Sequence, residues 1–188
     1  DVRSTVQKEG VKAATLDLDL RDPEQRAQVI TATLKEFGTI DVLVNAAGLE
    51  TSAAYHDLPE KRIQDILSVN LEAPMMLTRA VLPQMLKQGR GHIVSIASLA
   101  GKFGPGFQEP YCATKAGLTA FTYSLRGTYQ GTGVSASVVC PGFVEAGIYT
   151  RMKDQLGRPA PGLLGAAACS PQAVARAVIR VIERDWPE

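Results

Sequence analysis

The sequence IDVLVNAAG runs from Ile40 to Gly48 and joins an apolar run to a cluster of small residues. A run as apolar as 40–44 is typical of a parallel strand that is covered on both faces of its sheet. Small side chains at the carboxyl end of such a strand let a flat ligand approach the backbone, and open α/β sheets bind cofactors at that edge. A tight turn alone would also explain Ala46-Ala47-Gly48, so the cofactor interpretation depends on the rest of the chain.

Strand-like and helix-like segments alternate on both sides of this stretch. Apolar runs predict the strands, and helical periodicity with caps and stops predicts the helices between them. The alternation favours an α/β fold, a Rossmann-like doubly wound parallel sheet in which residues 1–188 form one domain, with an irregular segment at 143–170. The expected strands are 11–18, 40–44, 91–98 and 134–140, and the expected helices are the end of one at 1–9, then 26–37, two within 59–88, one from Pro110, and 172–184.

Composition excludes several classes of protein. The 188 residues carry a net charge of +1 and no basic run, which gives no electrostatic basis for binding nucleic acid. We expect no signal peptide and no membrane span, because the chain begins with a polar segment and lacks a long apolar stretch. The three cysteines are not spaced as a metal site, and neither His56 nor His92 has a partner at ligand spacing, so we expect free thiols, no metal and a cytoplasmic location.

The stretch Tyr111-Cys112-Ala113-Thr114-Lys115 places a cation beside a phenol. If Pro110 opens a helix, Tyr111 and Lys115 stand four residues apart on one face. A nearby positive charge stabilises a phenolate and would lower the pKa of Tyr111 from its ordinary value of about 10. Ser98, at the end of the preceding strand, would hold a carbonyl or alcohol oxygen. The alternative is an interfacial tyrosine beside a lysine with no chemical role.

Six features together resemble the short-chain dehydrogenase/reductase family. They follow the family's order and spacing from about residue 16 to residue 142. They are Asn45-Ala46-Ala47-Gly48, Asn70 in Ser-Val-Asn, Ser98, Tyr111, Lys115 and Pro141-Gly142.

The resemblance implies a role for each of these residues. Ser98, Tyr111, Lys115 and Asn70 would be catalytic: Ser98 would orient the substrate oxygen, Tyr111 would transfer its proton, Lys115 would lower the pKa of Tyr111 and bind the nicotinamide ribose, and Asn70 would hold a relay water. The implied cofactor is NAD or NADP. Its contacts would be Asp19, which would meet the adenine ring, with Asn45, Ala46, Ala47, Gly48, Tyr111, Lys115, Pro141, Gly142 and Val144.

The sequence departs from the family's pattern at two places. The glycine-rich dinucleotide loop of the family has no counterpart before Gly10, and Ala146 stands where the family often has a threonine, for which Thr150 is a substitute candidate. In the family's sheet a central strand lies between those expected at 11–18 and 40–44. We therefore expect the 188 residues to belong to a longer chain, or else to rearrange or exchange strands between copies.

The expected function is NAD(P)-dependent interconversion of a small-molecule carbonyl and a secondary alcohol. The alternative is a catalytically silent fragment of the family that serves as an oligomerisation or interaction unit. A third reading keeps the fold and cofactor but changes the reaction to epimerisation or dehydration. The family resemblance also implies a homodimer or homotetramer.

Overall fold

The computed structural model describes residues 2–145 and 168–188. Its centre is a three-stranded sheet in the order β1-β2-β3. Both pairs of strands are parallel, with Val42 of β1 opposite His92 of β2 and Gly91 of β2 opposite Val134 of β3. The predicted parallel α/β fold is therefore confirmed. The strands are β1 (Val42–Asn45), β2 (Gly91–Ile96) and β3 (Val134–Val139).

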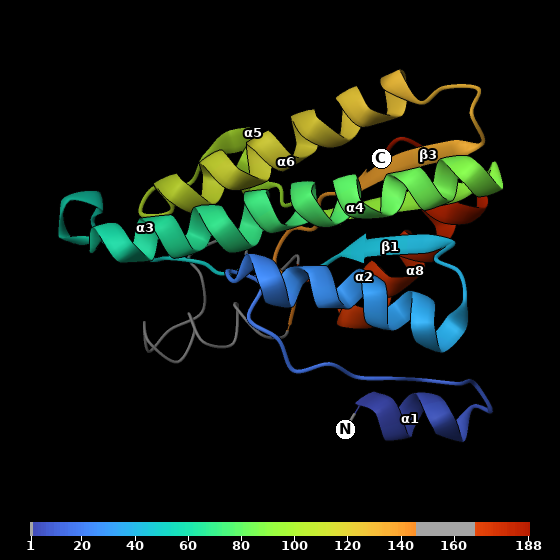
Figure 1. Ribbon diagram of the computed structural model, residues 1–188. Helices are drawn as coiled ribbons and strands as arrows, with labels where there is room; N and C mark the ends of the chain where they lie inside the picture. The colour runs from blue at the N-terminus through green and yellow to red at the C-terminus, as the bar shows by residue number, and fades with distance from the viewer. Residues whose placement is uncertain (1, 146–167) are drawn as a thin grey trace.

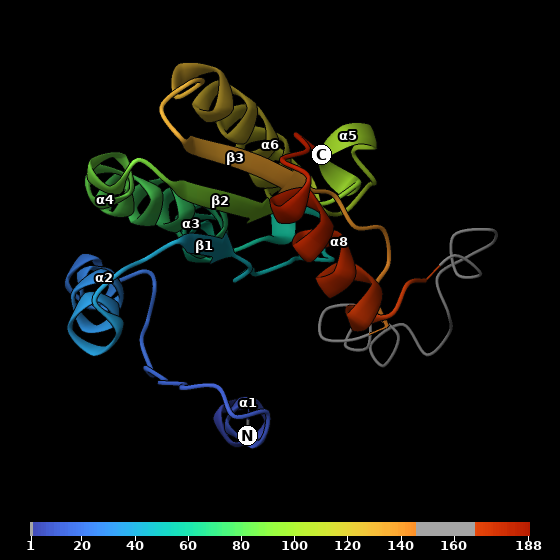
Figure 2. The ribbon, with the colours of Figure 1, turned by 90° about the vertical axis from the view of Figure 1, so that its right-hand side faces the viewer.

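Helices lie on both faces of this sheet (Figures 1 and 2). On one face, Ile30, Val81 and Met85 pack with Ile93 in the larger hydrophobic core. On the other face, Val181 packs against Val94 and Val139. The helices are α1 (Val2–Lys8), α2 (Pro23–Phe37), α3 (Glu60–Leu67), α4 (Ala73–Gln88), α5 (Ala100–Phe103), α6 (Glu109–Thr128) and α8 (Pro171–Glu183), with a short 3-10 turn η1 (Tyr55–Asp57) and a π-helical segment η2 (Ser68–Glu72).

Side-chain caps are present at the start of two helices. The Asp22 side chain accepts hydrogen bonds from the backbone N–H groups of Glu24 and Gln25 at the start of α2. The Ser170 side chain accepts from Ala173 N at the start of α8. Such bonds satisfy donors that a helix N-terminus otherwise leaves unpaired. Gly38 ends α2 in the left-handed conformation with φ 80°, which glycine adopts without a steric penalty.

The strand predicted at 11–18 is wrong, because this segment has no regular secondary structure. Its apolar residues Val11 and Leu16 are about half exposed. A strand needs backbone partners on a neighbouring strand, and Figures 1 and 2 both show this segment apart from β1. Its contact is instead with α2, where Lys12 Nζ lies 2.9 Å from a Glu36 carboxylate oxygen.

The expectation that the strand at 40–44 is covered on both faces is also wrong. Val42 and Val44 are 40% and 41% exposed, whereas β2 is buried along its middle. The reason is the position of α8, which packs over β2 and β3 and leaves the corresponding face of β1 open. Leu43, on the other face of β1, packs against the larger core.

The two helices predicted within 59–88 are joined without a loop. The π-helical segment η2 connects α3 directly to α4, and Asn70 lies in it, fully buried. A π-helical turn is rare and is frequent at functional sites. At the other end of the chain, Pro187 O accepts a hydrogen bond of 2.9 Å from Val138 N, so the terminal residues lie along the free edge of β3. None of the described helices is long and apolar enough to cross a membrane.

Candidate active site

The predicted catalytic residues meet at the carboxyl end of the sheet. Beyond the strands, Ala97 N donates to Val139 O at 2.8 Å and Leu99 N donates to Pro141 O at 3.0 Å. These bonds continue the parallel pairing of β2 and β3, so the backbone around Ser98 is fixed on both sides. The carboxyl edge of a parallel sheet is where α/β proteins bind their ligands.

The Ser98 hydroxyl lies near the Tyr111 phenol, and its hydrogen bonding acts to lower the pKa of that phenol. Ser98 Oγ accepts a hydrogen bond of 3.1 Å from Ala100 N, which fixes the serine side chain and leaves its proton available to another acceptor. Burial raises the pKa of Tyr111 above its ordinary value of 10.0, and the Ser98 bond opposes that rise only in part. The phenol is therefore protonated at neutral pH.

Lys115 is buried behind Tyr111 and is 5% exposed. Its Nζ donates a hydrogen bond of 2.7 Å to Ile96 O and lies 5.7 Å from the centre of the Tyr111 ring. Burial lowers the pKa of Lys115 to about 8. In this structure the ammonium is held by a backbone carbonyl and burial dominates the pKa of Tyr111, so a lowering of that pKa by Lys115 stays a prediction.

Asn70 uses its amide to hold the loop that follows β1. Its Oδ1 accepts from Leu49 N at 2.7 Å, and its Nδ2 donates to Leu49 O at 2.8 Å and to Thr114 Oγ1 at 3.2 Å. A buried amide needs such partners. The side chain thus has a clear positioning task, while its predicted part in a water relay stays a prediction.

The small residues after β1 lie next to Lys115. A Cβ on Gly48 would stand 3.7 Å from Lys115 Nζ and 3.6 Å from Asn70 Oδ1, so the backbone of Gly48 runs directly beside both groups. Ala46 and Ala47 are exposed at the sheet edge. The Asn45 side chain points instead toward α4, where Nδ2 lies 3.5 Å from Thr78 Oγ1.

The remaining predicted cofactor residues are more widely placed. Asp19 forms a bidentate ion pair with Arg21, whose bonds hold the pKa of that carboxyl at about 2. Pro141 is tied to Leu99, Gly142 is near the Leu99 side chain, and Val144 forms a parallel bridge with Cys169. Ala146 and Thr150 lie outside the described residues.

The structure also answers the expectations about histidines and thiols. His56 is exposed, while His92 is buried with Nε2 2.8 Å from Ser137 Oγ. Cys112, Cys140 and Cys169 are free, as predicted. Two residues of the site were missed by sequence reasoning. Thr114 lies within the stretch from Tyr111 to Lys115, yet nothing in its spacing shows that it faces Asn70. Gly101 packs closely against the backbone of α6.

The lining of this site fits the ribose end of a nicotinamide cofactor. A lysine ammonium carries three donors, and Ile96 O takes one of them, so two remain for ribose hydroxyls. The exposed Ala46 and Ala47 leave the sheet edge open to a flat ligand. Among residues 2–145 and 168–188, no glycine-rich strand–helix turn stands beside β1 to hold a pyrophosphate.

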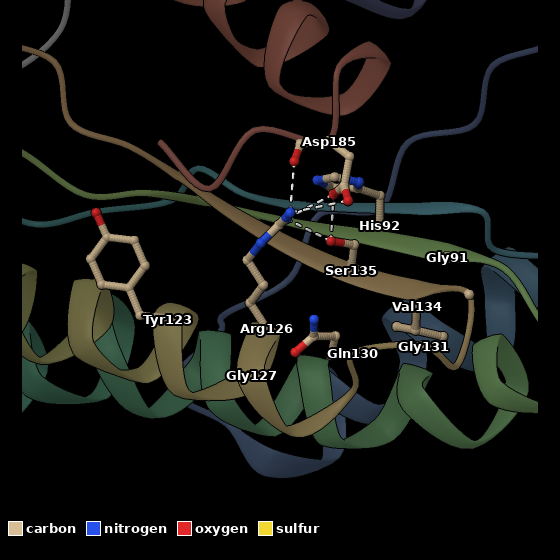
Figure 3. A pocket seen from close by; sticks show the side chains of 11 residues that line it. Gly91, His92, Tyr123, Arg126, Gly127, Gln130, Gly131, Val134, Ser135 and Asp185 are labelled. Carbon is tan, nitrogen blue, oxygen red and sulfur yellow. Dashed lines mark hydrogen bonds and ion pairs between the residues drawn. The ribbon is translucent and has the colours of Figure 1, made fainter.

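A cavity of about 640 Å³ lies at the opposite end of the strands (Figure 3). Gly91 and Val134, which begin β2 and β3, line it together with the last turns of α6. Arg126 spans it and pairs with Asp185 at 2.7 Å, so its charge is already satisfied. None of the predicted catalytic residues lines this cavity, which places it outside the candidate active site.

The comparisons with known proteins decide the family. The family model for short chain dehydrogenases matches residues 1–157. The chain belongs to the short-chain dehydrogenase family. Ketoacyl reductase HetN of Nostoc sp. (strain PCC 7120) is 40% identical over 185 residues, which cover 98% of this chain and 63% of that protein. The 3-oxoacyl-[acyl-carrier-protein] reductase FabG of Escherichia coli (strain K12) is 33% identical over 174 residues, covering 90% of this chain and 70% of its own length.

A solved structure of this family has the same fold. A metagenomic short-chain oxidoreductase, crystallised in complex with NADP, superposes with a TM-score of 0.72 at 34% sequence identity. The match covers 77% of this chain and 66% of that one. The chain therefore spans less than two thirds of the length of that oxidoreductase and of HetN. Family and fold, both expected from the sequence, are confirmed.

Proposed function

We propose that the chain is an NAD(P)-dependent oxidoreductase that interconverts a carbonyl and a secondary alcohol. The observation that carries this proposal is the buried Lys115 ammonium 5.7 Å from the centre of the Tyr111 ring, with the Ser98 hydroxyl beside the phenol. Ser98, Tyr111 and Lys115 thus share one edge of the sheet, which gives that edge a hydroxyl, a phenol and an ammonium. Membership of the short-chain dehydrogenase family and the NADP complex of a relative support the same reaction class.

Each side chain has a chemical task in the reduction. Ser98 donates to the carbonyl oxygen and orients it, and Tyr111 delivers the proton to that oxygen as general acid. Bound NAD(P)H would supply the hydride. Lys115 would hold the ribose, and Asn70 keeps the loop at Gly48 in place beside it. Because burial raises the pKa of Tyr111, the phenol already carries the proton that reduction needs at neutral pH.

For the substrate we propose a 3-oxoacyl thioester. HetN and FabG are named as reductases of ketoacyl and 3-oxoacyl groups. In this chain, Leu99, Phe103 and Phe107 follow Ser98 and are large apolar residues that are 40%, 59% and 63% exposed. Phe107 has a positive φ of 66°, a strained conformation for a residue that is not glycine and one that clusters at functional sites. These side chains suit contact with an acyl chain.

One observation favours the alternative of a silent interaction unit. Val42 and Val44 leave an apolar surface on the edge strand β1, and such an edge can pair with another chain. On this alternative the chain would act through assembly, and a homodimer or homotetramer, which we also propose for the enzyme, would be its working form.

Cofactor titration separates the two functions. We expect saturable binding of NADPH or NADH to the chain, followed by nicotinamide fluorescence. Lys115→Met should weaken that binding by about 10- to 150-fold, because a hydrogen bond from a charged group contributes roughly 1.5–3 kcal/mol. Lys87→Met, at an exposed position in the last turn of α4, is the matched control. A folded chain that binds neither cofactor would overturn the enzyme proposal and favour the interaction unit.

A further inference from the structure

Thr114 stands between Tyr111 and Lys115 on α6, and the proposed reaction gives it no chemical task. It is three residues after Tyr111 and one before Lys115, and its side chain is completely buried. It does not face the substrate side of the helix. Its hydroxyl points toward η2, the π-helical segment that carries Asn70.

The Thr114 hydroxyl bonds two neighbours. It donates to Tyr111 O at 2.7 Å and accepts from Asn70 Nδ2 at 3.2 Å. A hydroxyl has one proton. Because that proton is directed at Tyr111 O, the oxygen lone pairs are presented to the amide. The Thr114 side chain therefore connects the backbone of α6 at Tyr111 with the side chain of Asn70.

Asn70 in turn fixes the backbone of the loop after β1. Both polar atoms of its amide engage the backbone of Leu49, at 2.7 Å and 2.8 Å. The next residue toward β1 is Gly48, whose backbone runs beside Lys115 Nζ. Without an acceptor at Thr114, one amide proton of the fully buried Asn70 would lose its partner, and the amide would rotate or admit water to regain one.

We propose that Thr114 is a positioning residue of the proton-transfer site, which acts by holding the Asn70 amide against Leu49 and so keeping Gly48 packed beside Lys115. The importance of this task for turnover rests on the proposed function. Its structural consequence does not, because Gly48 packs beside Lys115 in the cofactor-free chain.

The pKa of Lys115 reports how closely Gly48 packs beside its ammonium. Burial holds the pKa of Lys115 at about 8, and the Cys140 thiol after β3 opposes this in part, while the ring of Tyr111 on the same helix lies 5.7 Å from Nζ. Neither changes when Thr114 is replaced by valine. A looser loop would let water reach the ammonium, and the pKa of Lys115 would rise toward its ordinary value of 10.5.

The test is a pH titration of the Lys115 side-chain carbon shift by NMR on the cofactor-free chain, assigned with Lys115→Arg. We expect Thr114→Val to raise the midpoint by at least about half a pH unit, a roughly threefold change in the acid dissociation constant. Thr114→Ser keeps the hydroxyl and should retain the midpoint of the unaltered chain. If the valine variant titrates like the unaltered chain, the proposal is overturned.

The matched control is Thr122→Val on the same helix. Thr122 is equally buried, and its hydroxyl lies 2.7 Å from Leu118 O and 2.8 Å from Ser95 Oγ, away from Asn70. We expect it to lower stability about as much as Thr114→Val while the midpoint of Lys115 stays unchanged. An equal shift in both variants would show a general loosening of α6 and would contradict the proposal. Absence of carbonyl reduction would overturn the proposed function and leave this result standing.

Discussion

Replacing Tyr111 with phenylalanine is expected to lower kcat for carbonyl reduction by about 10²- to 10⁴-fold, the range that a positioned general acid contributes. The phenyl ring keeps the packing of the buried side chain, and the bond from Thr114 to the Tyr111 backbone carbonyl is unaffected. Only the proton donor and the partner of Ser98 are lost. The rate is followed as oxidation of NADPH in the presence of a 3-oxoacyl thioester.

Tyr55→Phe is the control for this prediction, because Tyr55 is an exposed tyrosine in η1. It should leave kcat unchanged. The affinity of Tyr111→Phe for NADPH should stay within about threefold of the unaltered chain, which separates loss of chemistry from loss of binding. Retention of more than about a tenth of the rate in Tyr111→Phe would exclude Tyr111 as the proton donor.

The second large effect is expected at Gly101, where α5 meets α6. A Cβ built there would stand 2.7 Å from both Ala116 N and the carbonyl carbon of Lys115, which are backbone atoms that cannot turn aside. Gly101→Ala must therefore move α5 away from α6. Because Ser98 is bonded to Ala100 N, this movement pulls the serine from Tyr111.

We expect Gly101→Ala to lower stability by about 1–3 kcal/mol, the usual cost of overpacking, and kcat/KM by about 10- to 100-fold. Thermal unfolding and steady-state kinetics measure the two effects. Gly106→Ala lies in the same connection with no atom within 4 Å of its Cβ, so both quantities should stay near those of the unaltered chain. An active Gly101→Ala enzyme of normal stability would show that this contact does not position Ser98.

The parts of the fold that the sequence predicts well are those with strong local signals. Pro110 stands in the first turn of α6, and the apolar run after Gly91 forms the buried central strand β2. Asn70 is fully buried in the predicted helical region, as an amide within an apolar pattern suggests. Periodicity and capping chemistry act within a few residues, so they can be read from one chain.

The errors concern effects that act between distant parts of the chain. Residues 11–18 are apolar enough for a strand, but a strand forms only where another strand supplies hydrogen bonds. The exposure of Val42 and Val44 depends on where α8 lies, which the pattern of β1 does not encode. The burial of Tyr111 and the direction of Lys115 Nζ also depend on the tertiary structure, so an i, i+4 spacing does not give the pKa of Tyr111.

In the proposed reaction, hydride passes from a nicotinamide cofactor to a carbonyl carbon beside Tyr111. The most direct test is reduction of 3-oxobutanoyl-CoA with NADPH that carries deuterium at both hydrogen positions of nicotinamide C4, with mass analysis of the product. We expect a 3-hydroxy product that carries deuterium at C3, in proportion to the NADPH oxidised. A product without deuterium at C3, or no product from a folded chain that binds NADPH, would contradict it.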